Sequence, residues 1–302
     1  MRKVLAALAA PALVAVVLAG CGSSEKTSTS STTSTSASST IPTQSVDSEI
    51  AAKVPAKYKS KSSLIIATEP EYAPNEFIEN GKIVGMDPDL MTAIAEVLGL
   101  KVSFAEAQFT AIIPGIKAGK YDVGASSFTD TAERQKEVEF VDYFEAGQSF
   151  YAKSSSSPNV ETVADLCGKT VAVEKGTVEQ EEAEKQNKLC SKEGKKPITL
   201  SVFTGQSEVN LAVSSGRSEV GMADSPVAAY QVKQSNGGFK IIGKTFEVAP
   251  YGIALPKGGG LAQPFLEALE KLIANGTYIK IMQKWGIAEG AIKKPGINEA
   301  KS

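Results

Sequence analysis

The sequence of 302 residues lacks histidine altogether. Hydrolases that use a histidine base are therefore excluded, and the commonest protein ligand for zinc, copper and iron is missing. An excess of positive charge is also absent, because 32 Lys and Arg stand against 34 Asp and Glu. Nucleic-acid binding normally needs a basic surplus or a basic stripe, so no nucleic-acid partner is expected.

Glycine-rich phosphate loops are missing as well. The run Gly258-Gly259-Gly260 follows Pro256-Lys257 without the spacing of a Walker motif, which predicts an ordinary loop. We therefore expect no cofactor and no metal. With 42% hydrophobic residues, the chain can still bury a core.

The N-terminus is typical of an exported protein. Residues 1–20 have the basic start and apolar run of a secretory signal peptide. The apolar run is about fifteen residues long, whereas a membrane span needs about twenty. It ends in Leu18-Ala19-Gly20-Cys21, which resembles the lipobox of bacterial lipoproteins. The resemblance implies cleavage before Cys21 and attachment of palmitate or similar chains there; the alternative is a free Cys21 at the end of an uncleaved anchor.

A polar tract follows the predicted lipidation site. Serine and threonine make up 17 of the 23 residues from 23 to 45. Such a tract cannot bury enough apolar surface to offset its chain entropy. We therefore expect residues 21–61 to form a flexible tether to a membrane, with O-glycosylation left open.

Two further cysteines, Cys167 and Cys190, remain once Cys21 carries lipid. An exported protein folds in an oxidising compartment, which favours a disulfide between them. In the chain-entropy model, a disulfide closing a loop of this length stabilises by about 3 kcal/mol. The alternative is a pair of buried, unpaired thiols.

Strand and helix patterns alternate from Leu64 onward. β-rich runs occur at 64–68, 102–105, 122–125, 170–174, 198–203, 219–223 and 239–242. The clearest helix is predicted to begin at Asp87, as its N-cap, and to end before Gly99, and another is predicted over Ala262–Ala274. This alternation predicts an α/β fold with parallel sheets flanked by helices, in which ligands bind beyond the carboxyl ends of the strands.

Nine short segments together resemble the polar amino-acid branch of ABC-transporter substrate-binding proteins, the family 3 extracellular solute-binding proteins. They follow one another in family order between Leu64 and about Gly286. The segments are Glu69–Phe77, Val84–Leu90, Ala111–Ile116, Tyr121–Gly124, Ser126–Arg134, Val173–Thr177, Ala223–Ala228, Tyr251–Ala254 and Asn275–Tyr278.

The resemblance implies a two-lobed fold of the type II periplasmic-binding-protein class. Each lobe would be a sheet flanked by helices, and two crossover strands near 148–153 and 248–255 would act as a hinge. The first lobe would comprise residues 62–149 and 251–302, and the second residues 150–250.

The implied function is that of a binding protein, not an enzyme. The expected protein is a monomer, held outside the cytoplasm by its lipid anchor, that binds a free amino acid and delivers it to an ABC permease. The first alternative is a same-fold enzyme, such as a dehydratase acting on a small carboxylic acid. Without histidine it would need Glu69, Asp130 or Glu179 as acid or base. A sensor domain is disfavoured, because no signalling segment follows residue 302.

A free amino acid carries two charges, and an unpaired buried charge costs about 3–5 kcal/mol. The family resemblance assigns Arg134 to the ligand carboxylate, which a guanidinium binds through two parallel hydrogen bonds. It assigns Asp224 to the ligand ammonium group. Ser127, Thr129 and Thr177 are expected to add hydrogen bonds.

The side chain of the ligand is expected to lie between Tyr72 and Phe109. Glu69, Asp87 and Asp130 are the candidate specificity residues. The first two match positions that are acidic in the branch that binds basic amino acids, so we expect a cationic or strongly polar amino acid.

Simpler roles stay open for these residues. In the simpler interpretation, Arg134 pairs with Glu133 or Glu137 on a solvated helix, Asp224 and Asp87 cap helices, and both aromatic residues belong to a core. Four positions depart from the family pattern, and all concern the side-chain subsite. They are Asn75, Asp130, Val178 and Glu179.

Overall fold

The structure is a computed structural model, and it describes residues 40–300. The predicted signal peptide, Cys21 and the predicted tether up to residue 39 lie outside the described residues. No helix within the described range has both the length and the apolar character that crossing a membrane requires.

The strands of residues 40–300 form a large sheet and a small one. The small sheet is antiparallel and consists of β2 (Glu71–Tyr72), β3 (Glu76–Glu79) and β4 (Lys82–Val84). The large sheet consists of β1 (Leu64–Thr68), β5 (Val102–Glu106), β6 (Val123–Gly124), β7 (Val138–Lys153), β8 (Thr170–Glu174), β9 (Thr199–Phe203), β10 (Val220–Asp224), β11 (Phe239–Pro256) and β12 (Ala291–Ile297).

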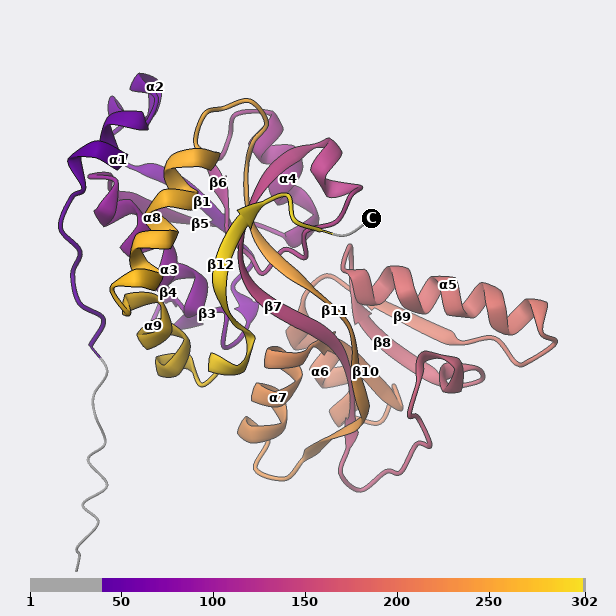
Figure 1. Cartoon of the computed structure of the whole chain (residues 1–302). Helices are drawn as coiled ribbons and strands as arrows, with labels where there is room; N and C mark the ends of the chain where they lie inside the picture. The colour runs from indigo at the N-terminus through magenta and orange to yellow at the C-terminus, as the bar shows by residue number, and fades with distance from the viewer. Residues whose placement is uncertain (1–39, 301–302) are drawn as a thin grey trace, which may run out of the picture. The chain divides into compact units, whose positions relative to one another are not determined.

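Two long strands, β7 and β11, lie antiparallel at the centre of the large sheet (Figure 1). On one side β11 is followed by β6, β1 and β5, and on the other β7 is followed by β10, β8 and β9. β1 is parallel to β5 and β6, and β8 is parallel to β9 and β10. We call the part built on β1, β5 and β6 the first lobe and the part built on β8, β9 and β10 the second lobe. The predicted two-lobed fold is confirmed, although the shared crossover strands merge the two lobe sheets into one.

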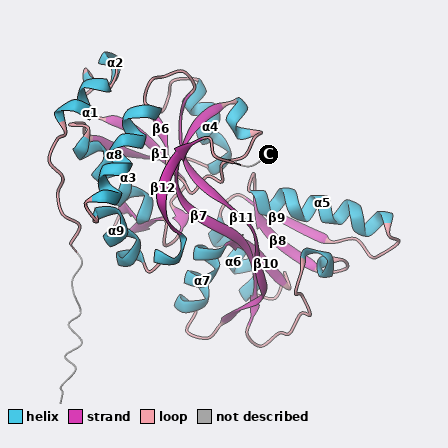
Figure 2. Ribbon diagram, in the orientation of Figure 1, coloured by secondary structure: helices cyan, strands magenta, loops and turns pink. Residues whose placement is uncertain are grey.

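Helices flank the sheet of each lobe (Figure 2). The first lobe has α3 (Met86–Val97), α4 (Phe109–Lys117), α8 (Ala262–Ala274) and α9 (Thr277–Trp285). The second lobe has α5 (Val178–Lys192), α6 (Gln206–Ser214) and α7 (Ser225–Gln234). Short 3-10 turns are η1 (Arg134–Lys136), η2 (Val163–Leu166) and η3 (Ala288–Gly290). Each lobe buries its own apolar cluster, with Ile94 and Phe265 in the first and Val171 and Met222 in the second.

The start of α3 differs from the prediction. The helix begins at Met86 with Gly85 at the N-cap, and Asp87 lies inside its first turn instead of capping it. A Cβ on Gly85 would lie 2.1 Å from the carbonyl oxygen of Asn75, and Gly85 has a φ of 140°. Only glycine suits such a close approach and such a backbone, so this residue fixes where α3 begins.

A disulfide joins Cys167 and Cys190, as predicted. Cys167 follows η2, and Cys190 is a buried residue of α5. The bond therefore ties α5 to the loop that leads into β8.

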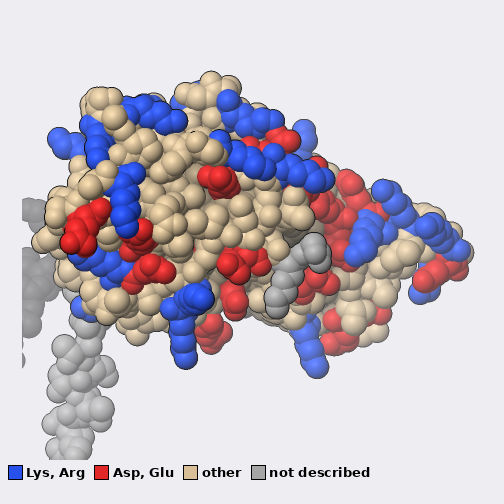
Figure 3. Space-filling view, turned by 45° about the horizontal axis from the view of Figure 1, so that its top comes forward, with Lys and Arg blue, Asp and Glu red and all other residues tan. Residues whose placement is uncertain are grey.

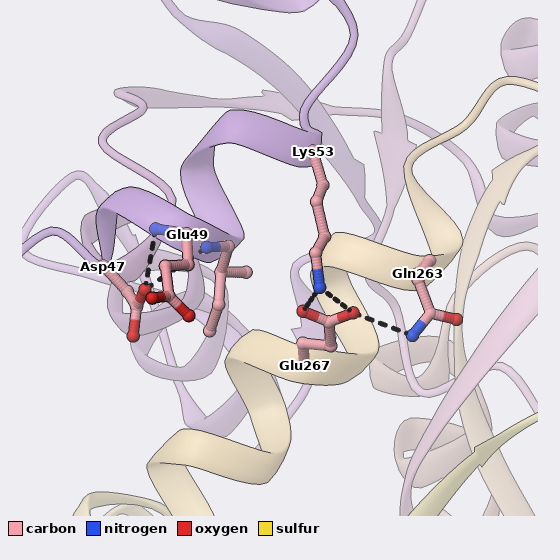
Figure 4. Close-up of polar contacts among 6 residues, drawn as sticks. Asp47, Glu49, Lys53, Gln263 and Glu267 are labelled. Atoms are coloured by element: carbon pink, nitrogen blue, oxygen red, sulfur yellow. Dashed lines mark hydrogen bonds and ion pairs between the residues drawn. The ribbon is translucent and has the colours of Figure 1, made fainter.

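The predicted tether is wrong for its last part, because residues 48–59 fold onto the first lobe. They form α1 (Ser48–Lys53) and α2 (Ala56–Lys59). Asp47 caps α1 by accepting hydrogen bonds from the backbone N–H groups of Glu49 and Ile50, at 3.0 and 3.2 Å (Figure 4). Lys53 pairs at 2.6 Å with Glu267 of α8.

Two apolar side chains explain why this polar segment folds. Val54 and Tyr58 are 2% and 4% exposed within the apolar cluster of the first lobe. Their burial removes apolar area from water, which the serine- and threonine-rich tract before them cannot do. The polar composition of the region concealed these few residues.

We expect Tyr58→Ala to lower the free energy of unfolding by about 3 kcal/mol or more, as aromatic truncations in a core do. Urea denaturation followed by circular dichroism measures this change. Ser48→Ala removes an exposed side chain of the same segment and should change the value by less than about 0.5 kcal/mol. Equal, small effects of both substitutions would mean that α2 is not part of the folded core.

Candidate functional site

A cavity of about 300 Å³ lies between the two lobes. It is lined by Glu69, Tyr72, Glu76, Phe109, Ser126, Ser127, Thr129, Arg134, Glu174, Thr177, Val178, Glu179 and Asp224. Glu69 directly follows β1 and Ser126 lies two residues after β6, whereas Glu174 and Asp224 end β8 and β10. The carboxyl ends of the parallel strands of both lobes thus meet at the cavity, which is the usual ligand position in open α/β sheets.

Arg134 reaches the cavity from η1. Its Nη1 donates a hydrogen bond of 2.7 Å to the carbonyl oxygen of Thr129, and its Nη2 donates one of 3.0 Å to that of Gly176 in the second lobe. The guanidinium group lies 5.4 Å from the ring centre of Phe109. None of the ion pairs found among residues 40–300 includes Arg134. It therefore offers a positive charge that its neighbours orient through neutral groups.

Asp224 and Tyr72 connect the lobes across the cavity. The hydroxyl of Tyr72 donates to Oδ2 of Asp224 at 3.0 Å, and the backbone N–H of Asp224 donates to the Tyr72 oxygen at 3.1 Å. Burial raises the pKa of Asp224 to about 6. Asp224 precedes Ser225, the first residue of α7, but its side chain makes no capping hydrogen bond.

Two hydroxyl groups of the cavity wall are engaged by the protein itself. Thr177 caps α5 by accepting from the N–H of Gln180 at 3.3 Å, and it donates to the carbonyl oxygen of Glu174 at 2.9 Å. Ser127 donates its hydroxyl to Oε2 of Glu76 at 3.1 Å. These bonds fix the wall on both lobes.

Asp87 and Asp130 do not line the cavity, although the sequence suggested them as specificity residues. Asp87 lies behind Ser127, where it accepts from the Ser127 N–H at 3.0 Å and from the Tyr143 hydroxyl at 2.6 Å. Asp130 accepts from Gln135 at 2.9 Å and from the N–H of Ala300 at 3.1 Å. Both carboxylates support the wall. The other eight predicted ligand residues do line the cavity.

Sequence analysis missed three acidic residues of the cavity. Glu76, Glu174 and Glu179 are each no more than 2% exposed. Glu179 was noted as a departure from the family pattern and as a candidate acid or base of the alternative enzyme, but not as a ligand residue. The other two lie inside segments that carry the family resemblance. An acidic residue at the end of the apolar run 170–174 was the available signal, because a strand ends there at the ligand edge.

The cavity is strongly acidic. Its five carboxyl groups, from Glu69, Glu76, Glu174, Glu179 and Asp224, face the single guanidinium of Arg134. Burial, followed by the charge of Glu71, raises the pKa of Glu69 to about 8. Burial and then neighbouring acids likewise raise the pKa of Glu76, Glu174 and Glu179. Figure 3 shows that acidic side chains also gather near the beginning of α5, and basic ones toward its end.

Within the part of the chain that the structure describes, no three side chains of Asp, Glu or Cys are arranged to hold a metal ion. An organic cation is the alternative partner for such a set of carboxylates.

A second, wider cavity of about 1440 Å³ lies against α7, α9 and the crossover strands. Its charged lining residues are two acids, Glu145 and Glu289, and two bases, Lys233 and Lys284. It therefore lacks the one-sided charge of the first cavity. The first cavity is the candidate ligand site.

The sequence matches the bacterial extracellular solute-binding proteins, family 3, over residues 64–288. The chain belongs to this family.

Individual relatives agree with the family. The arginine-binding protein ArgT of Corynebacterium glutamicum is 32% identical over 300 residues, which cover 99% of this chain and 96% of that protein. A solved ancestral arginine-binding protein bound to glutamine is 39% identical, with a TM-score of 0.68 over 75% of this chain and 99% of that one. The ancestral amino acid-binding protein AncCDT-1, a precursor of cyclohexadienyl dehydratase, is 31% identical, with a TM-score of 0.68 over 76% and 97%. The chain is thus a solute-binding protein and not an enzyme.

We expect the ligand-free protein to be less stable at pH 8.5 than at pH 5. The pKa values of Glu69, Asp142 and Asp224 are raised by burial to about 8, 7 and 6, against about 4 in an unfolded chain. A raised pKa means that the folded state holds the proton more tightly, so this stabilisation is complete below about pH 4 and is lost as the pH rises through 6 to 8. The melting temperature, measured by calorimetry across this range, should fall.

Two matched substitutions show whether buried or exposed acids cause this fall in melting temperature. Glu174→Gln removes a buried acid and should reduce this fall, whereas Glu161→Gln removes an exposed acid of the same lobe and should leave it unchanged. A melting temperature that rises steadily from pH 5 to pH 8.5 would contradict the assignment.

Proposed function

We propose that this protein binds a cationic amino acid outside the cytoplasm and delivers it to the membrane permease of an ABC importer. The observation that carries the proposal is that one guanidinium group and five carboxyl groups line a single interlobe cavity. An amino acid with a cationic side chain suits this lining. Its carboxylate can bind the guanidinium group, and its two positive charges can bind carboxyl groups.

The ligand carboxylate would bind Arg134. The guanidinium group is held by the carbonyl oxygens of Thr129 and Gly176, so it is oriented without being neutralised. Thr129 precedes η1 in the first lobe, and Gly176 precedes α5 in the second lobe. The Arg134 side chain therefore contacts both lobes. A carboxylate bound there would take charge-assisted hydrogen bonds, which are stronger than neutral ones.

The ligand ammonium group would bind Asp224. In the described structure Oδ2 of this residue accepts the Tyr72 hydroxyl. Asp224 comes from the second lobe and Tyr72 from the first, so a ligand at this point bridges the lobes. Closure around a ligand by movement of two domains is a recognised mode of ligand capture.

The ligand side chain would lie along Phe109 and Tyr72 toward Glu69. Aromatic faces and carboxylates both attract cations. The name of the relative ArgT as an arginine-binding protein supports this chemistry, so arginine is our first candidate and lysine the second.

The rest of the proposal follows from the predicted N-terminus. Lipid at Cys21 would hold the protein at a membrane surface, and the predicted tether up to residue 39 would let it reach a permease. We propose that it acts as a monomer.

A thermal-shift panel of the twenty amino acids on the mature chain without lipid tests this function. A ligand at a hundred times its Kd stabilises by about 2.7 kcal/mol, so arginine or lysine should raise the melting temperature clearly. Arg134→Ala should abolish the shift, because the ligand carboxylate loses its partner.

Arg217→Ala is the control for this panel. Arg217 is an exposed arginine of the second lobe outside the cavity, so its removal should leave the shift intact. The proposal fails if no cationic amino acid shifts the unmodified protein, or if Arg134→Ala responds as the unmodified protein does.

A further inference from the structure

The charged groups of the cavity divide into two regions. Burial lowers the pKa of Arg134, and the charges of Glu181, Glu179 and Asp224, in that order, counter this effect. Burial raises the pKa of Glu174, and among the neighbouring charges that of Glu69 raises it most. We call the part of the lining around Arg134 and Asp224 the mixed-charge region, and the part formed by Glu69 and Glu174 the acidic region.

Glu174 is the acid of this region that lacks protein partners. Its side chain is buried, with the residue 2% exposed, and Oε2 has no hydrogen-bond partner among the described residues. Buried polar atoms in folded proteins are almost always hydrogen-bonded. The position of this atom in the cavity wall indicates that the missing partner is a ligand.

Glu69 faces Glu174 from the opposite lobe. The only hydrogen bond from the described residues to the Glu69 carboxylate is a long one of 3.4 Å, from the N–H of Glu71 to Oε2. A Cβ on Gly205, at the start of α6 in the second lobe, would lie 3.4 Å from Oε1 of Glu69. The side chain thus extends from the first lobe to the second.

Two other acids of the cavity already have hydrogen-bond partners in the protein. Glu76 accepts from the hydroxyls of Ser126 and Ser127, at 3.4 and 3.1 Å. Asp224 accepts from Tyr72 at 3.0 Å. Glu179 also has an unpartnered oxygen, Oε1, but its charge acts on the guanidinium group of Arg134. Glu69 and Glu174 are therefore the acids most in need of a cation.

We propose that Glu174 determines specificity: its carboxylate and that of Glu69, one from each lobe, hold the distal cation of the ligand between them. The inference rests on the proposed function and adds a contact from the second lobe to the distal group. The α-carboxylate and α-ammonium groups then occupy the mixed-charge region. A distal cation lowers the repulsion between the two lobes at this point, whereas a neutral side chain does not.

The test compares arginine with citrulline, its neutral isostere, by isothermal titration calorimetry on the mature chain without lipid. Glu174→Gln keeps the size of the side chain and removes one charge-assisted hydrogen bond to the cation. Such a bond is worth a factor of about ten to a hundred, so arginine affinity should fall by that factor. Citrulline affinity should change by less than about threefold, because a neutral group gains little from either side chain.

Two further variants locate the effect. Glu71 is an exposed acid near Glu69 and does not line the cavity. Glu71→Gln therefore measures the effect of removing a nearby negative charge without a direct contact. It should leave the ratio of arginine affinity to citrulline affinity nearly unchanged. Glu69→Gln should lower arginine affinity as Glu174→Gln does. The double variant should lose less than the sum of both effects, since residues holding one ion are coupled.

The outcomes distinguish this inference from the proposed function. If the unmodified protein binds arginine but Glu174→Gln retains the arginine-to-citrulline ratio, or changes it no more than Glu71→Gln does, Glu174 does not contact the cation and the inference alone fails. If the unmodified protein binds no cationic amino acid, the proposed function fails together with the inference. A melting temperature for each variant confirms that it is folded.

Discussion

Repulsion among buried carboxyl groups is the constraint on which the site depends. Five such groups, each no more than 6% exposed, share a cavity with one guanidinium group. A buried acid stays neutral or finds a cation, because burial penalises its charged form. Without a cation, protons meet this condition, since burial raises the pKa of Glu69 to about 8. A cationic ligand meets it without them, so ligand and protons compete for the same carboxylates.

The fold supplies this arrangement through strand ends that come from two lobes. Glu69 follows β1, Glu174 ends β8 and Asp224 ends β10, so neither lobe holds the full set. The antiparallel pair of β7 and β11 runs through both lobes and connects them. Hydrogen bonds from Tyr72 to Asp224 and from Arg134 to Gly176 then cross the cavity. The charge cluster therefore exists only where the two lobes meet.

Sequence patterns predicted the elements that have strong periodicity. The bounds of β1, β8 and α8 agree with the predicted runs, because short apolar strands and an amphipathic helix each carry a clear signal. Arg134 and Asp224 were predicted from the family resemblance and lie in the cavity. Glu174 was missed because the burial of an acid depends on tertiary packing, which no local pattern encodes. The helices α1 and α2 were missed because a polar composition concealed Val54 and Tyr58.

Competition with protons also sets how strictly the cavity can select for charge. When the acids are protonated, they are neutral hydrogen-bond donors and acceptors, and a neutral polar side chain meets no unpaired charge. When they are ionised, only a cation avoids leaving a buried charge unpaired. Selectivity for a cationic over a neutral amino acid must therefore increase with pH over the range in which Glu69 loses its proton, near its pKa of about 8. An acid with an ordinary pKa would be ionised throughout that range and would give a preference that pH does not alter.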